Sequence, residues 1–356
     1  MRSEQGHASA SAAGQMGRGS SAISLRDVGA KAGVSFQTVS KVLKGKGNVS
    51  EATRERVLSA ATELGYVPNS LARGLATQRT LSIGFLTSGL AAFVFGPMLL
   101  GAEREARKHG YFMSFSFVDG TAANARHALQ QLIERRADGV ISAATNAGSD
   151  AAYGELLRTG VKSVATHPIP GGGVPVVGED GVHTGELGVE HLTGLGHRTI
   201  AILAGEWDGS TISGRLEGNQ RALHNAGGSL RTDLIEVGDW TIEGGYAATQ
   251  RLLARGIPFT GVVSHNDHMA MGAIRALQDA GLRVPEDVSV VGCDDVDFAA
   301  FTNPPLTTVR ISFESTGIVA VRTLIQRIDG DGAVPERVVL PCSIVIREST
   351  GSARSI

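Results

Sequence analysis

VSFQTVSK, residues 34–41, is the middle of three helix-sized blocks within the basic segment 23–80. Its valines recur at helical spacing, so one side of a helix formed here would be apolar. Phe36, Gln37 and Lys41 then fall on the opposite side, where another molecule can reach them. Taken alone, the pattern also fits an ordinary surface helix with one exposed phenylalanine.

Capping residues mark the ends of the three blocks. Ser24 can cap the first helix, with Asp27 as the far member of a capping box, and Gly33 would end that helix. Ser35 and Ser50 occupy the capping position of the second and third helices. Three short helices with a polar front on the second predict a helix-turn-helix head, in which the second helix enters the major groove of DNA.

The chemistry of the second block suits contact with DNA bases. The Gln37 amide can pair with adenine, Lys41 can donate to guanine or to a phosphate, and Phe36 can contact a thymine methyl group. Residues 23–80 carry nine Lys/Arg against four Asp/Glu, whereas residues 81–356 carry twenty-two against thirty. This uneven charge indicates that the small segment meets a polyanion and the large one does not.

From Leu81 onward, apolar strand-like runs alternate with amphipathic helical blocks, as in IGFL, GVISA, TIAILA, GVVS and VSVVG. Continuously apolar strands between helices imply parallel sheets covered on both faces. Because the alternation is too long for one sheet, it predicts an α/β region of two doubly wound lobes with a cleft. Ligands of such sheets bind outside the carboxyl ends of the strands.

Five side chains near predicted strand ends are therefore candidate ligand contacts: Ser88, Arg215, Trp240, Asn266 and Asp294. Arg215 is expected to open its helix. The set suits a polyol such as a sugar, because charged groups can bind adjacent hydroxyls while an indole covers the apolar ring face. Each residue also has a purely structural interpretation, as a helix cap, a surface ion pair or a core aromatic residue. Taken singly, Ser88 and Trp240 favour the structural interpretation.

Other features narrow the class of protein. The 356 residues exceed what one core usually serves. No metal-ligand spacing surrounds Cys293 or Cys342, and no phosphate-binding loop or nucleophile elbow is present, so we expect no metal, no cofactor and no enzyme. Without a signal peptide or an apolar span, the chain is expected to be cytoplasmic. An extracytoplasmic sugar-binding protein is the rival for residues 81–346, but it would lack the basic head.

ISLRDVGAKAGVSFQTVSKVL and VSEATRERVLSAATELGYVPNSLARGLATQRT, within residues 23–80, resemble the head and hinge of the LacI/GalR family of transcriptional regulators. HTGELGVEHLTGLGHRTIAILAG and HNDHMAMGAIRALQDAGLRVPEDVSVVGCDD resemble its effector-binding core, which is similar to periplasmic sugar-binding proteins of type I. The resemblance implies a repressor whose affinity for a double-stranded, near-palindromic operator is switched by a small molecule, with a sugar or sugar derivative expected. It also implies a homodimer.

The resemblance assigns roles along the chain. It implies a head at 23–67, a hinge helix and linker at 68–80, an effector-binding and dimerisation core at 81–346 and a tail at 347–356. Residues 1–22, which are rich in Ser, Ala and Gly, are expected from their composition to form a disordered extension. The core is expected to cross between its lobes near 178, 309 and 338. The implied DNA contacts are Ser35, Phe36, Gln37, Thr38, Ser40, Lys41, Asn69, Ala72 and Leu75, the last as a wedge between base pairs.

The resemblance also bears on the ligand contacts. It places effector contacts on Arg215, Asn266 and Asp294, less directly on Ser88, and sets Trp240 against a sugar. Two departures stand out in this chain. Cys293 replaces a usual aromatic residue, and Thr166, His167 and Pro168 occupy a region where sugar-responsive members often carry an acidic contact.

Overall fold

The computed structural model describes residues 23–43, 45, 47–67, 79–88, 94–118, 121–144, 150–169, 171–205, 210–330 and 332–354. Packing divides the chain into two compact units, residues 1–76 and residues 77–356, and each is described by itself. The expectations for the extension and for most of the hinge lie outside the described residues, as do Asn69, Ala72 and Leu75.

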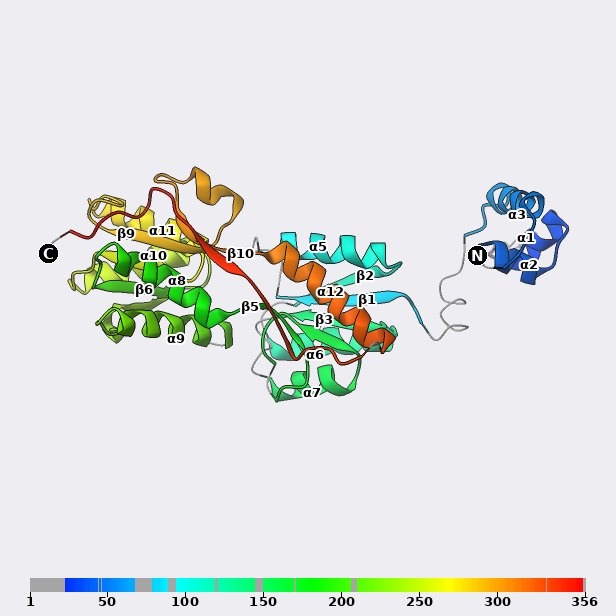
Figure 1. Ribbon diagram of the computed structural model, residues 1–356, viewed down its shortest axis with the longest axis horizontal. Helices are drawn as coiled ribbons and strands as arrows, with labels where there is room; N and C mark the ends of the chain where they lie inside the picture. Colours follow the sequence, from blue (N-terminus) through cyan, green and yellow to red (C-terminus); the bar gives the residue numbers. More distant parts are fainter. Residues whose placement is uncertain are drawn as a thin grey trace, which may run out of the picture. The chain divides into compact units, whose positions relative to one another are not determined.

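The first unit is helical over its described residues (Figure 1), with helices α1 (Leu25–Ala32), α2 (Phe36–Leu43) and α3 (Glu51–Glu63). The predicted capping box is present, because Ser24 N donates to Asp27 Oδ2 at 2.8 Å while Asp27 N donates to Ser24 Oγ at 3.4 Å. Gly33, at φ 67°, ends α1 in the left-handed conformation that glycine adopts without strain.

The prediction that Ser50 is the capping residue of α3 is confirmed. Its backbone takes the extended conformation of a capping residue, but the side chain makes no capping hydrogen bond. The Ser50 hydroxyl instead lies 2.9 Å from Thr53 Oγ1, a nearby hydroxyl that competes for it. The start of α3 therefore depends on packing against α1 and α2, through buried residues such as Val57.

The second unit begins with a sheet in the order β11-β5-β4-β3-β1-β2, and each described strand pair in it is parallel. Its strands are β1 (Ser82–Thr87), β2 (Phe112–Phe117), β3 (Gly139–Ala143), β4 (Ser163–Ala165), β5 (Val176–Glu179) and β11 (Arg337–Leu340). Helices α5 (Phe95–Lys108) and α12 (Phe313–Asp329) cover one face, and α6 (Ala122–Glu134) and α7 (Ala151–Thr159) cover the other. Neighbouring residues of β1 face opposite ways, so Phe85 packs under α5 while Leu86 packs under α6.

A second sheet has the order β12-β10-β9-β8-β6-β7, parallel except for β12 against β10. Its strands are β6 (Ile200–Ala204), β7 (Ile235–Val237), β8 (Gly261–Ser264), β9 (Ser289–Asp294), β10 (Thr307–Ile311) and β12 (Cys342–Val345). Helices α8 (Gly181–Gly194) and α9 (Ser210–Asn225) cover one face, and α10 (Ile242–Ala254) and α11 (Asp267–Asp279) cover the other. The predicted class, a helical head followed by two doubly wound lobes, is confirmed.

Within the described residues the chain passes between the two sheets three times, each time through one residue. Asp180 joins β5 to α8, Ser312 joins β10 to α12, and Pro341 joins β11 to β12. As a result α12, late in the sequence, lies beside α5 in the first lobe (Figure 1).

Glycines bring three helix pairs into backbone contact: α5 with α12, α8 with α9, and α10 with α11. A Cβ atom added to the glycine would lie only 2.0 Å from a backbone carbonyl oxygen of the partner helix at Gly218, Gly272 and Gly317. No side chain fits at such a distance, so these positions require glycine. Among the described helices, none combines the length and apolar character that a bilayer crossing requires.

Candidate functional site

The exposed face of α2 carries the side chains predicted to read DNA. Val39 and Val42 are buried against the other two helices, whereas Phe36 is 49 % exposed and Gln37 and Lys41 are also exposed. Burial of the valines holds one side of the helix against the rest of the head. The opposite side stays exposed, as a groove-reading helix requires.

The remaining predicted residues of this helix lie close to its first turn. The Ser35 hydroxyl accepts a hydrogen bond from Thr38 N at 3.2 Å and lies 3.0 Å from Thr38 Oγ1, so both side chains help to start the helix. Thr38 and Ser40 are partly exposed. The turn before the helix is tight, since a Cβ on Gly29 would lie 2.8 Å from Val34 O. The position of α2 relative to α1 is therefore set by the backbone.

In the second unit, three of the predicted ligand contacts gather at the carboxyl edge of the second sheet. Asp294 is the last residue of β9, Asn266 follows β8, and Trp240 follows β7. The Asn266 side chain joins two of these segments, because its Nδ2 donates to Trp240 O at 2.9 Å while its Oδ1 accepts from Met269 N to cap α11. Asn266 thus has a structural role, and the loops at this edge are fixed relative to each other.

The Trp240 ring packs mainly against the core and does not form an open surface for a ligand. Its ring lies against Gly205, where an added Cβ would meet the indole at 2.0 Å, and it packs on the apolar cluster beneath α8 and α9. Trp240 itself has φ 71°, an unusual conformation for a large side chain, which turns the chain between β7 and α10. Ser88 lies directly after β1, at the corresponding edge of the first sheet.

Arg215 joins the two lobes. It is 6 % exposed, and its Nη1 donates to His265 O at 2.5 Å while its Nη2 lies 3.3 Å from Glu179 Oε1 at the end of β5. The prediction that Arg215 opens its helix is wrong, because α9 begins five residues earlier at Ser210. The polar Ser and Thr residues there favour a loop only weakly, and packing against α8 overrides them.

The surroundings of Arg215 are buried and charged. Burial raises the pKa of Asp294 well above its ordinary value, although the nearby guanidinium of Arg215 opposes that rise. Burial likewise lowers the pKa of His265 to about 3, and Arg215 adds to this effect. The carboxyl edge of the second sheet therefore holds a permanent cation beside a neutral imidazole.

Unpaired polar atoms collect at these strand ends. Among the described residues, buried side-chain atoms without a hydrogen-bond partner include Thr87 Oγ1, Arg215 Nε, His265 Nδ1 and both ring nitrogens of His167. Each of these residues stands at or near the carboxyl edge of a sheet or faces it. Since buried polar groups are nearly always paired, such a gathering indicates a place prepared for a polar ligand.

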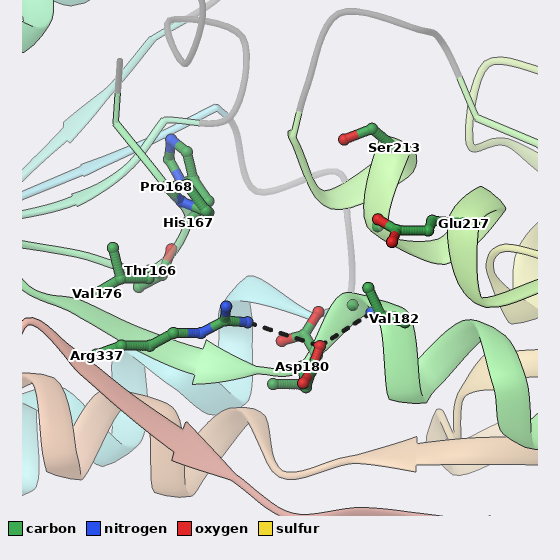
Figure 2. Close-up of a pocket in the computed structure, with 12 residues that line it drawn as sticks. Thr166, His167, Pro168, Val176, Asp180, Val182, Ser213, Glu217 and Arg337 are labelled. Carbon is green, nitrogen blue, oxygen red and sulfur yellow. Dashed lines mark hydrogen bonds and ion pairs between the residues drawn. The ribbon is translucent and has the colours of Figure 1, made fainter. Parts of the chain in front are cut away.

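A cavity of about 210 Å³ lies between the first lobe and α9 (Figure 2), lined among others by His167, Glu179, Asp180, Ser213, Glu217 and Arg337. Figure 2 shows His167 and Pro168 on one side of the cavity and Ser213 and Glu217 on the other. None of the five predicted ligand contacts is among the described lining residues; Arg215 adjoins the cavity through Glu179. In the sequence His167 stands out only as a departure from the family pattern, although its place just after β4 is a signal that could have found it.

The buried histidines predict a loss of stability in acid. The pKa of His265 is about 3 when folded against an ordinary 6.5, so its contribution is complete above pH 6.5 and is lost as the pH falls toward 3. Between pH 7.5 and pH 5 the advantage of the native protein over His265→Gln should shrink by about 2 kcal/mol. Urea unfolding of both proteins at the two pH values measures this. An advantage that does not change with pH would show that the ring is solvated in the folded state.

Residues 24–69 match the bacterial regulatory proteins, lacI family, and residues 189–350 match the periplasmic binding protein-like domain. The lactose operon repressor of Escherichia coli (strain K12) is 36% identical over 332 residues, covering 92% of this chain and 91% of that protein. The chain belongs to the LacI family.

Two solved structures of transcriptional regulators are similar to this chain. The lac repressor dimer bound to operator and the anti-inducer ONPF is 34% identical, with a TM-score of 0.85 over 93% of this chain and 99% of that one. The transcriptional regulator CelR in complex with cellobiose is 33% identical, with a TM-score of 0.71 over 92% of this chain and 99% of that one. The prediction of a DNA-binding transcriptional regulator of the LacI family, and not an enzyme, is confirmed.

Proposed function

We propose that this LacI-family protein is a homodimeric repressor that reads a near-palindromic operator with the α2 helices of two copies. A sugar or sugar derivative, bound between the two lobes of residues 81–346, changes its affinity for that operator. The head would be residues 23–67 and the link between head and core residues 68–80. The observation that carries the proposal is the exposed polar face of α2, with Phe36, Gln37 and Lys41 outward and two valines buried behind it.

The core supports regulation by a small molecule. Arg215 and Glu179 meet across the two lobes, so a ligand that alters their contact acts on both lobes at once. A ligand can shift the balance between two lobe arrangements only by the difference in its affinity for them. A coupling of about 1–3 kcal/mol, equivalent to roughly 5–150-fold in operator affinity, is typical of such switches.

Two relatives support a sugar as the ligand class and a dimer as the assembly. One solved relative is described as a complex with cellobiose, and another as a dimer bound to operator. Selection of binding sites from random duplex DNA, followed by operator titration with and without neutral sugars, tests the proposal. An enriched sequence with inverted symmetry is expected. Enrichment of no sequence would exclude an operator-reading role.

Gln37→Ala should remove sequence discrimination without removing DNA binding. The lost amide contact is worth about 1–3 kcal/mol of preference for the correct base, while contacts to phosphates stay. The measurement is the affinity for the selected operator, for single-base variants of it and for random DNA. Ser59→Ala, an exposed change on α3, is the matched control and should leave all three affinities unchanged. An equal loss on operator and random DNA would argue against base reading by Gln37.

A further inference from the structure

His167 is a buried histidine whose ring makes no hydrogen bond with any residue that the structure describes. It is 4 % exposed, and neither Nδ1 nor Nε2 has a partner among the described residues. The ring lines the cavity between the first lobe and α9 (Figure 2). A buried polar group without a partner has lost its hydration and gained nothing in return. The two nitrogens therefore mark where a bound molecule can supply the missing partners.

A second buried histidine of the same chain shows that burial alone does not leave an imidazole without hydrogen-bond partners. His197 is 2 % exposed, yet its Nδ1 lies 2.9 Å from Thr260 Oγ1 and its Nε2 lies 3.0 Å from Gly351 O. The fold thus provides hydrogen-bond partners for a buried imidazole that does not line the cavity. Within the described part of the chain it provides none for His167, which borders the cavity.

The charges around the cavity are already paired. The three lining carboxylates, Glu179, Asp180 and Glu217, contact Arg215 at 3.3 Å, Arg337 at 3.7 Å and Arg221, respectively. Arg337 is the only cation among the described lining residues, and it is engaged with Asp180.

This pairing selects against charged ligands. A phosphate or carboxylate group in the cavity would lie beside three carboxylates with no unengaged cation from the described lining, and an ammonium group would have to displace an existing pair. Burial lowers the pKa of His167 to about 4, so the ring adds no charge at neutral pH. An uncharged ligand meets neither obstacle.

We propose that His167 contacts the effector directly and makes the site selective for an uncharged, hydroxyl-bearing molecule about the size of one sugar ring. A neutral imidazole offers one donor and one acceptor, and hydroxyl groups can satisfy both. The volume of about 210 Å³ is below the ~300 Å³ at which pockets for drug-sized ligands begin, which favours a compact ligand. This inference rests on the proposed function, in that it assigns the ligand class of the same cleft.

Direct binding to the full chain, without DNA, tests the ligand class. Ribose, glucose and galactose are compared with their phosphate esters and with glucuronate and galacturonate, by calorimetry and by the shift in melting temperature. At least one neutral sugar should bind, and its phosphate and acid counterparts should bind at least tenfold more weakly. Tighter binding of a phosphate or an acid, or no binding of any neutral sugar at millimolar concentration, would overturn the inference.

Variants test the role of the ring. His167→Leu should raise the melting temperature of the ligand-free chain, because it removes an unpaired buried polar group, and should weaken binding of the neutral sugar at least tenfold. His167→Asn keeps a donor and an acceptor and should restore part of that affinity. A lower melting temperature with unchanged affinity in His167→Leu would show that the residue only supports the fold.

Thr260→Val, which removes one partner of His197, is the matched control. It should lower the melting temperature and leave sugar affinity unchanged, and a tenfold loss of affinity in this variant would overturn the specific role of His167. The operator assay separates this inference from the proposed function. If a neutral sugar binds in a manner that depends on His167 but does not alter operator affinity, the regulatory role fails while the site assignment stands.

Discussion

Arg215→Ala should abolish the response of operator binding to the effector and destabilise the core. The arginine is buried and contacts Glu179 of the first lobe and His265 O of the second, so its loss leaves a carboxylate without its cation and removes a contact between the two lobes. Removing one partner of a buried ion pair costs about 3–5 kcal/mol. Urea unfolding of the core measures the first effect. Operator titration with and without effector measures the second, and the ratio of the two affinities should fall to about 1.

A surface arginine provides the comparison. Arg275 lies on α11, is exposed, and contacts Asp279 at 3.0 Å. Arg275→Ala should change the free energy of unfolding by less than about 1 kcal/mol and leave the effector response intact, because exposed ion pairs contribute little. A response that survives in Arg215→Ala would mean that the lobes are coupled through other contacts.

Gly218→Ala should push α9 away from α8. The new Cβ would lie 2.0 Å from Val182 O, and a backbone oxygen cannot move aside as a flexible side chain can. Overpacking of this kind costs about 1–3 kcal/mol and sometimes more. Because α9 carries Ser213 and Glu217 at the cavity, effector affinity should fall together with the melting temperature.

Gly194→Ala, at the end of α8, is the matched control. Nothing lies within 4 Å of a Cβ added there, and its φ is one that alanine adopts readily. This change should be neutral or should stabilise by about 0.4–1 kcal/mol, since it restricts the unfolded chain. If both glycine variants had equal effects, close helix contact would not be the cause.

The elements of this fold could be predicted because their signals are local. Ser24, Asp27 and Gly33 form the expected cap and stop of α1, and apolar runs such as Ile200–Ala204 become buried strands. The start of α9 differs from the prediction because it depends on packing against α8, which the polar residues at Ser210 do not reveal.

The site could be predicted only in part, for a different reason. The rule that ligands bind beyond strand ends brings Trp240, Asn266 and Asp294 to one edge of the second sheet. The rule cannot say which edge residues of the first sheet face them. The contact of Glu179 with Arg215, and the unpaired ring of His167, arise from how the two lobes meet, and that depends on contacts between residues far apart in the sequence.

The glycine contacts between paired helices limit how this receptor can deform. Helices whose backbones already touch cannot be compressed or slid past one another, so each sheet moves with its covering helices as one rigid body. Rotation of one lobe relative to the other then requires changes in the backbone torsions of Asp180, Ser312 and Pro341, the three described single-residue joints. Since the ring of Pro341 locks one of its two backbone torsions, that joint is the stiffest of the three. It restricts the directions in which one lobe can rotate relative to the other.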